Sequence, residues 1–438
     1  MGTAGRCCAG GCWRAALPIC AAGRILTQHP AARRSRRSRC RNKDRADPVT
    51  TNQARTARLR DQIIAFTATR TIINTGHRMV YPFLPTFARG VGVDLDAVAL
   101  AVTARYGLGI ISPVFGSLAD RRWRRAAMIT GALIFAAGLG LVAIWPSYPA
   151  LFVALLLATT GKFIYDPAMQ AYIGDRVAYT QRGLAIALTE FSWSGAFLLL
   201  IPILGWLIDR TGWWAIPFPI LAVLSLLAAL LLWWIVPSDM PQPHERPQLA
   251  QGIRLIMQHT PALAGLAVGG LISSSNEVIS IIFGEWLEDA FGLKVAALGA
   301  ASAVIGIAEL TSEGAVAAFV DRLGKHRAVA LGIGGNMLAS LLLPVLGFNR
   351  AGALVGLFLL YVTFEFALVS LIPLMTELTP DARATLMAGN VAALSAGRMV
   401  GALIGPPLFG LGLLANSITA AVLGGIALVV LLRLVRQE

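Results

Sequence analysis

The sequence is poor in charged residues, which make up only 14% of its 438 positions. Soluble domains carry roughly 25% charged residues, because their surfaces must face water. Hydrophobic residues make up 56% of this chain, and its mean hydropathy is +0.68. These figures exclude a soluble globular protein, and they also exclude disordered, collagen-like and disulfide-scaffold proteins. The composition therefore predicts an integral membrane protein.

Cysteine is absent beyond residue 40, and so are the common catalytic motifs. No histidine or second cysteine pair follows the CC-x3-C sequence (7–12) at zinc-ligand spacing, so we expect no metal site and no cofactor. The G-x-S-x-G, H-E-x-x-H and G-x4-G-K-[ST] motifs do not occur. The segments between hydrophobic runs are too short for a soluble catalytic domain, so we expect no catalytic residues and no enzyme. The five cysteines are Cys7, Cys8, Cys12, Cys20 and Cys40.

The positive charge is concentrated in residues 1–60. The formal net charge of the chain is +14, and these residues supply +12 of it. Their sequence RRSRRSRCRNKDR (33–45) could attract anionic lipid or nucleic acid by charge alone. We favour the simpler interpretation, which is a disordered basic cytoplasmic tail with no nucleic-acid partner.

Beyond residue 60 the chain is a succession of apolar runs, each long enough to supply the about 20 residues that cross a bilayer. Backbone groups in lipid must be satisfied internally, so these runs predict helices. The longest break, 237–260, predicts a cytoplasmic linker between an N-terminal six-helix bundle (61–236) and a C-terminal six-helix bundle (261–438). The predicted fold class is an all-α membrane protein with twelve transmembrane helices in two pseudo-symmetric bundles. The runs lie near 62–88, 97–118, 126–146, 149–173, 184–207, 213–236, 261–287, 295–318, 328–347, 351–375, 385–411 and 416–434.

Lysine and arginine are divided unevenly among the breaks between these runs. If both termini lie on one side of the membrane, that side holds fourteen of them and the other side holds four. Positively charged loops stay in the cytoplasm. We therefore expect a multi-pass protein of the inner (plasma) membrane with both termini in the cytoplasm. The four residues on the outer side are Arg89, Arg210, Lys294 and Arg350.

The two halves of the chain carry a similar charged motif at equivalent places. GSLADRRWRR (116–125) follows the second run, and AAFVDRLGKHR (317–327) follows the eighth. The first copy resembles the G-x-L-a-D-R-x-G-R-[RK] motif of the major facilitator superfamily, with Trp123 at the usual second glycine. The second copy keeps the Asp-Arg pair but has Ala317 in place of the opening glycine. Paired halves with matching breaks are typical of transporters that work by alternating access.

The resemblance implies that these charges form a gate at the cytoplasmic surface. In the family, such contacts hold the halves together when the cytoplasmic side is closed, and a carboxylate there can face the positive end of a helix. We expect the basic residues of the first copy to pair with Asp175 and those of the second copy with Glu377. The alternative is that these charges only set the topology. The predicted gate residues are Gly116, Asp120, Arg121, Arg124, Arg125, Asp175, Arg182, Asp321, Arg322, Gly324, Lys325, Arg327, Glu377 and Arg383.

Ionisable residues also lie inside the apolar runs of both halves. A charge at the bilayer centre costs at least about 2.5–3.5 kcal/mol on insertion scales, and it marks a functional site by default. Five polar residues of the first run, from Arg70 to Tyr81, share one helix face. We expect these groups to line a central cavity that binds substrate and protons. The predicted cavity residues are Arg70, Asn74, His77, Arg78, Arg105, Lys162, Asp166, Glu190, Asn276, Glu277, Glu309, Glu365 and Arg398.

Two of these acids are the candidates for proton exchange. Glu277 and Glu365 have no basic residue within one turn of their own helices, so no neighbour holds them in the charged form. Arg78 and Arg398 can pair with these acids across the cavity, or they can bind an anionic group of the substrate. Both interpretations are compatible with the sequence.

Two further polar features have a structural interpretation beside the functional one. Lys162 and Asp166 lie one turn apart, so each can neutralise the other as a structural pair. His77 is either a proton relay or a hydrogen-bonded packing residue.

The sequence thus predicts a secondary active transporter of a small organic solute. The buried carboxylates indicate coupling to protons, and we favour export over import, as in drug and metabolite efflux proteins. The alternatives are a proton-coupled nutrient importer and a non-transporting membrane sensor on the same scaffold. The expected partners are a small-molecule substrate, protons and the lipid bilayer, and we expect a monomer.

Overall fold

The computed structural model describes residues 48–111, 124–177, 179–237, 249–379 and 382–435, without the side chains of 48–58, 179–184, 187 and 249–250. By its internal contacts the chain divides into Met1–Thr51 and Asn52–Glu438, and nearly all of the described residues belong to the second unit. The described residues form helices and no strand, so the predicted all-α class is confirmed. The predicted tail (1–60) lies almost wholly outside the described side chains.

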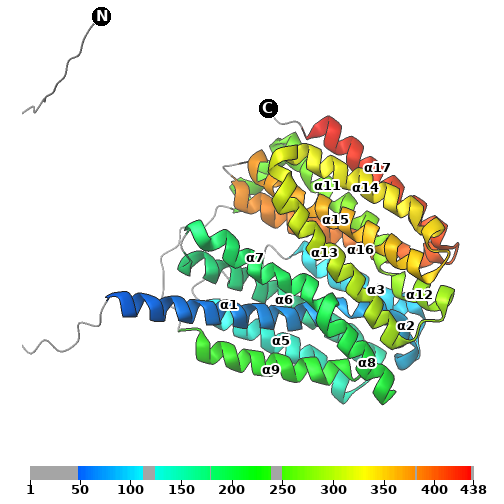
Figure 1. Cartoon of the computed structure of the whole chain (residues 1–438), viewed down its shortest axis with the longest axis horizontal. Helices are drawn as coiled ribbons and strands as arrows, with labels where there is room; N and C mark the ends of the chain where they lie inside the picture. The colour runs from blue at the N-terminus through cyan, green and yellow to red at the C-terminus, as the bar shows by residue number, and fades with distance from the viewer. Residues whose placement is uncertain (1–47, 112–123, 178, 238–248, 380–381, 436–438) are drawn as a thin grey trace, which may run out of the picture. The chain divides into compact units, whose positions relative to one another are not determined.

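The helices that precede the long break at 237–260 are termed the first-half helices (Figure 1). Their bounds are α1 Pro48–Arg78, α2 Val80–Val91, α3 Leu95–Ile110, α5 Arg124–Ile144, α6 Tyr148–Arg176, α7 Tyr179–Gly195, the π-helical turn η1 Ala196–Leu200, α8 Ile201–Thr211 and α9 Pro217–Ile235.

A short helix, α10 Leu249–Gln258, lies in the predicted linker, and the second-half helices follow it (Figure 1). Their bounds are α11 Thr260–Ser280, α12 Phe283–Phe291, α13 Val295–Leu323, α14 Lys325–Leu346, α15 Arg350–Leu378, α16 Arg383–Phe409 and α17 Leu413–Leu434. The division into two six-helix bundles remains a prediction.

Ten segments of the described chain are long and apolar enough to cross a membrane, whereas the sequence predicts twelve. The first predicted span is missing from the ten because it carries charge and is divided at Met79 into α1 and α2. The second is missing because the described part of α3 has only 16 residues before residues 112–123, which are not described. Both absences have a local cause, and the twelve-helix arrangement is compatible with them.

Equivalent helices in the two halves begin and end in the same way. α6 begins after Ser147 and α15 after Asn349, and each of these side chains accepts a hydrogen bond from the first turn of its helix. α2 ends at Gly92 and α12 at Gly292, which have φ of 73° and 62°. Glycine adopts this left-handed conformation without a steric penalty. The sequence repeat therefore extends to the ends of the helices.

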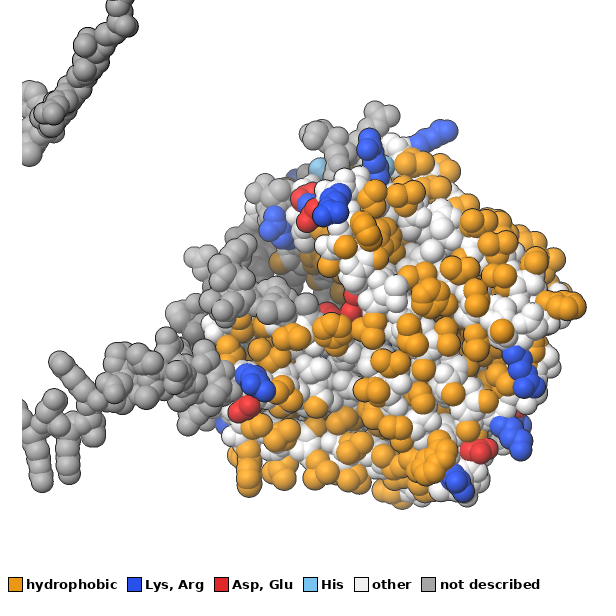
Figure 2. Space-filling model, viewed as in Figure 1, with side chains coloured by type: hydrophobic (Ala, Val, Ile, Leu, Met, Phe, Trp, Pro, Cys, Tyr) orange, Lys and Arg blue, Asp and Glu red, His pale blue; other side chains and the backbone are white. Residues whose placement is uncertain are grey.

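The two sets of helices touch each other through α2 and α12, α8 and α13, and α3 and α16. A methyl group at Gly299 would lie 3.1 Å from the Ile201 carbonyl oxygen, and one at Gly306 would lie 2.9 Å from that of Ser194. Two turns further along α13, a methyl group at Gly314 would meet nothing within 4 Å. The two sets of helices are thus in close contact toward the α2–α12 end, which we call the closed end. We call the opposite end, where α13 finishes, the open end. Figure 2 shows a hollow in the visible face, with acidic side chains inside it.

Candidate functional site

A cavity lies where the first-half and second-half helices meet. It encloses roughly 350 Å³ of space, a figure that includes space open to solvent. Five ionisable or amide residues predicted from the sequence line it, together with aromatic residues from both halves. The lining residues are Arg78, Tyr81, Trp193, Phe197, Asn276, Glu277, Ser280, Glu309, Tyr361, Phe364 and Arg398.

A buried ion pair joins the two halves at this cavity. Arg78 of α1 donates two parallel hydrogen bonds to Glu309 of α13, of which the Nη1–Oε2 bond is 2.8 Å long. The two side chains are only 4% and 2% exposed. The same guanidinium donates to the carbonyl oxygen of Trp193 at 2.8 Å and lies over the rings of Trp193 and Phe197. Bidentate geometry and aromatic stacking stabilise this almost wholly buried charge.

Glu277 takes part in a second contact between the halves. Its Oε1 accepts a hydrogen bond of 2.9 Å from the hydroxyl of Tyr81, which is also bonded to that of Tyr106. Arg105 lies behind these rings, fully buried, and donates to the carbonyl oxygen of His77 at 2.6 Å. Arg105 and His77 therefore lie in the first-half core behind the tyrosines and are not among the residues that line the cavity, contrary to our expectation that all of these groups face it.

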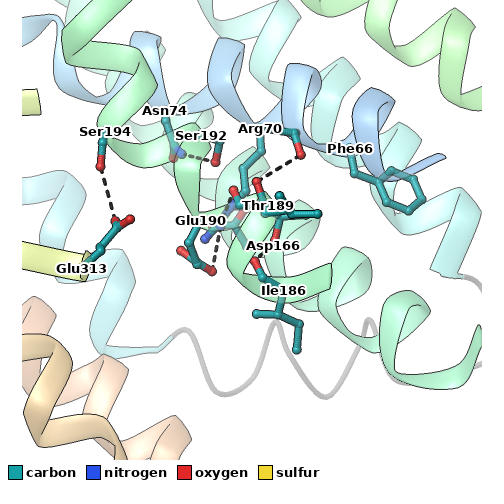
Figure 3. A network of polar contacts seen from close by, with 12 residues as sticks. Phe66, Arg70, Asn74, Asp166, Ile186, Thr189, Glu190, Ser192, Ser194 and Glu313 are labelled. Carbon is teal, nitrogen blue, oxygen red and sulfur yellow. Dashed lines mark hydrogen bonds and ion pairs between the residues drawn. The ribbon is translucent and has the colours of Figure 1, made fainter. Parts of the chain in front are cut away.

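A separate charge network within the first half joins α1, α6 and α7 (Figure 3). Arg70 pairs with Asp166 at 3.2 Å and with Glu190 at 2.8 Å. Lys162 donates to Asp166 at 2.7 Å and to Asn74 at 2.6 Å. The predicted Lys162–Asp166 pair is thus present, but it belongs to a network in which two bases balance two acids.

Three further polar residues of the second half, Glu313, Asn276 and Glu365, differ in their contacts. Ser194 of α7 donates to Glu313 of α13 at 3.3 Å, which is another contact between the halves (Figure 3). Asn276 donates to Ser280 at 2.9 Å. Glu365 of α15 is 7% exposed and forms no hydrogen bond or ion pair with another described residue.

The two arginines whose roles the sequence leaves open, Arg78 and Arg398, differ in whether they have an ion-pair partner. Arg78 is paired with Glu309, and not with Glu277 or Glu365. Arg398 of α16 has no hydrogen bond or ion pair among the described residues, and its guanidinium lies 6.0 Å from the ring centre of Tyr106 and 5.8 Å from that of Trp193.

The predicted gate residues are only partly described. Gly116, Asp120 and Arg121, and the side chain of Arg182, lie outside the described residues. Arg124 pairs with Asp175 between α5 and α6.

The second copy of the motif gives the equivalent pair between α14 and α15. Lys325 pairs with Glu377, and Gly324, at φ 82°, forms the turn before α14. The Arg124–Asp175 pair lies within the first half and the Lys325–Glu377 pair within the second, so neither pair links the two halves. Among the remaining residues, Arg383 donates to the carbonyl oxygen of Thr376 at 2.9 Å, and Asp321, Arg322 and Arg327 are exposed.

The aromatic part of the site could not be predicted from the sequence. Trp193, Phe197 and Tyr361 lie within apolar runs, where an aromatic residue is indistinguishable from a packing residue. Only the polar residues near them, such as Arg78 and Glu309, were predicted to face the cavity. The ion pair between Arg89 and Glu288, 2.8 Å long at the closed end, was also missed because its partners lie in different halves.

Comparisons with known proteins support this arrangement. A family model described as Major Facilitator Superfamily matches residues 67–402. The chain is 27% identical over 348 residues to the uncharacterized MFS-type transporter YceJ of Bacillus subtilis (strain 168), a match that covers 78% of this chain and 87% of that protein. It is 24% identical over 274 residues to the multi-drug resistance efflux pump PmrA homolog of Lactococcus lactis subsp. lactis (strain IL1403), covering 60% and 66% of the two chains.

Solved structures of transporters share the fold at low sequence identity. Peptide transporter POT in complex with sulfate has a TM-score of 0.69 at 16% identity and covers 85% of this chain and 94% of its own. A mutant of the nucleoside transporter NupG has a TM-score of 0.68 at 12% identity and covers 85% and 98%. At these identities the likeness establishes the fold alone.

Proposed function

The chain belongs to the Major Facilitator Superfamily and is a multi-pass membrane transporter; from this premise we propose that it moves a small organic solute by alternating access, coupled to protons, with export favoured. The observation that carries the proposal is the convergence of buried ionisable groups from both halves on one cavity. Arg78 and Tyr81 come from the first half, and Glu277 and Glu309 from the second. A cavity shared between two sets of helices changes its access when they move relative to each other.

The direction in which the cavity opens supports alternating access. The close contacts at Gly299 and Gly306 and the Arg89–Glu288 pair hold the halves together at the closed end. At the open end, the described Arg124–Asp175 and Lys325–Glu377 pairs stay within their own halves. In the alternate state, the motif charges would hold the open end together and the closed end would part.

The lysine and arginine residues between the apolar runs indicate which end of the transporter faces the cytoplasm. The excess of lysine and arginine in the breaks lies at the end where α17 finishes and α14 begins. The positive-inside rule places that end in the cytoplasm. On this proposal the open end faces the cytoplasm, and the protein is an inner-membrane transporter with both termini in the cytoplasm.

Proton coupling is assigned to Glu365 and Glu277. Asp166, Glu190 and Glu309 all have basic partners that stabilise their charged forms. Glu365 has no such partner among the described residues, and Glu277 accepts its described hydrogen bond from a neutral hydroxyl group. A carboxyl group in this position can gain and lose a proton without leaving a buried base unpaired.

The test begins with the purified full chain and a thermal-shift screen of small organic compounds. The compound that raises the melting temperature most is then used as the probe in proteoliposomes, with and without a pH gradient. We expect gradient-driven flux in the wild type and its loss in Glu365→Gln or Glu277→Gln. Asp209→Asn, at an exposed position on α8, is the matched control and should retain flux.

The outcomes separate the alternatives. If both glutamine variants keep full gradient-driven flux, the proton assignment is wrong. Binding without flux in sealed vesicles would instead support a sensor. If the solute moves into the cytoplasm together with protons, and only when a pH gradient is present, the protein is an importer.

A further inference from the structure

The cavity holds two arginines, and one of them has no partner on the described part of the chain. Arg78 is already paired, because three of its N–H donors bond Glu309 and the Trp193 carbonyl oxygen, and two aromatic rings lie against its guanidinium. Arg398 has none of these polar partners, although it lines the same space. A guanidinium group carries five N–H donors and does not lose its charge in proteins.

Helix packing determines where Arg398 points. Gly397 and Gly401 form the face of α16 that is pressed against α11, where a methyl group would collide with the backbone of Gly270 and with Glu277. Arg398 follows Gly397 by one residue, about 100° around the helix. Its guanidinium consequently reaches past α11 toward the first half, where it lies near the rings of Tyr106 and Trp193.

The acids nearby do not satisfy Arg398. Glu277 is the carboxylate on the adjacent face of α11, but no N–O distance between the two is short enough for an ion pair, and its Oε1 accepts from Tyr81. Glu365 likewise forms no ion pair with it. The charges of Glu277 and Glu365 act on Arg398 through space, but neither carboxylate accepts a hydrogen bond from it. A carboxylate or phosphate oxygen pair fits the free guanidinium fork best.

We propose that Arg398 binds the anionic group of the transported solute, and that Trp193, which lines the same cavity, contacts an adjoining planar apolar part of it. The substrate class is therefore an organic anion with a flat hydrophobic body, such as an aromatic carboxylate. This inference rests on the proposed transport function for its biological meaning, but the binding itself needs no flux. We assign no such role to Arg78, since its charge is already neutralised by Glu309.

The experiment compares three probes of matched shape and different charge: 1-naphthoate, 1-naphthamide and 1-naphthylmethylammonium. Binding to the purified full chain in detergent at neutral pH is measured by calorimetry and by thermal shift. We expect naphthoate to bind about tenfold or more tightly than naphthamide, and the ammonium compound to bind most weakly.

Variants test the residue directly. Arg398→Gln should bring naphthoate and naphthamide to similar affinity, and Arg398→Lys should keep a reduced preference for naphthoate, because it keeps the charge but not the fork. Arg433→Gln, at an exposed position near the end of α17, is the matched control and should behave as the wild type.

The proposal is overturned if the wild type binds naphthamide as well as naphthoate, prefers the ammonium compound, or binds none of the three. It is also overturned if folded Arg398→Gln or Arg398→Lys keeps the full preference of the wild type. Should Arg398→Gln fail to fold, the wild-type comparison of the three probes and the lysine variant still decide the question. A chain that binds naphthoate in this way but shows no flux in vesicles contradicts the transport proposal and leaves this one standing.

Discussion

Arg78 and Glu309 are 231 positions apart in the chain and form a buried, bidentate ion pair between α1 and α13. The pair lies at the cavity, between the glycine contacts of the closed end and the Ser194–Glu313 contact. Neither partner can be lost without leaving the other charge buried. We interpret the pair as the fixed point about which the two halves rearrange.

This interpretation predicts an asymmetric mutational response. Glu309→Gln leaves Arg78 unpaired in a dry site and should cost about 3–5 kcal/mol of stability. Replacing both residues by leucine removes both charges, and it should restore much of the melting temperature while abolishing flux. Thermal unfolding in detergent measures the first effect, and vesicle flux measures the second.

The exposed pair at the closed end provides the control. Arg89 is 62% exposed and Glu288 is 27% exposed, so Glu288→Gln should change stability by about 1 kcal/mol or less. An equal loss of stability in Glu309→Gln and Glu288→Gln would contradict the role given to the buried pair.

The glycine contacts of α13 predict a conformational effect. Gly299→Leu should force α13 away from α8, because even a methyl group there would lie 3.1 Å from the Ile201 carbonyl oxygen. The closed end should then open, and the cavity should become more accessible from that side. Gly314→Leu, where a methyl group meets nothing within 4 Å, is the matched control. Reactivity of a cysteine in the cavity toward impermeant reagents measures the change, and equal behaviour of the two variants would argue against the closed-end interface.

The motif charges predict a shift in the opposite direction. Asp120 lies outside the described residues, but its place in the first motif copy predicts that it helps to hold the open end together in the alternate state. Asp120→Asn should therefore increase the population of the inward-open state. If the accessibility of the cavity from either side is unchanged in this variant, the gate interpretation is wrong and the charges only set topology.

Much of this arrangement could be predicted from the sequence, because apolar runs and the charges within them are local features. The helices, the repeat and the polar residues that line the cavity all follow from such patterns. The pairing could not be predicted in the same way: Glu309 was expected only as a cavity residue, and its bond to Arg78 depends on how α1 and α13 are rotated.

The misplaced residues have the same physical explanation. Arg105 looks like a cavity residue from its charge, but the rings of Tyr81 and Tyr106 cover it. Trp193 looks like a packing residue but lies between two arginines. Periodicity gives the face of a helix, and it does not say which neighbour that face meets.

The most direct test of the account is the access to one cavity position from the two sides of the membrane. In a chain whose five native cysteines are replaced by serine, Asn276→Cys places a single thiol in the cavity. We predict that a membrane-impermeant thiol reagent labels it from either side of oriented vesicles, and that a transported solute alters the ratio of the two rates. Labelling from one side only, under every condition and in a variant that still transports, would contradict alternating access through this cavity.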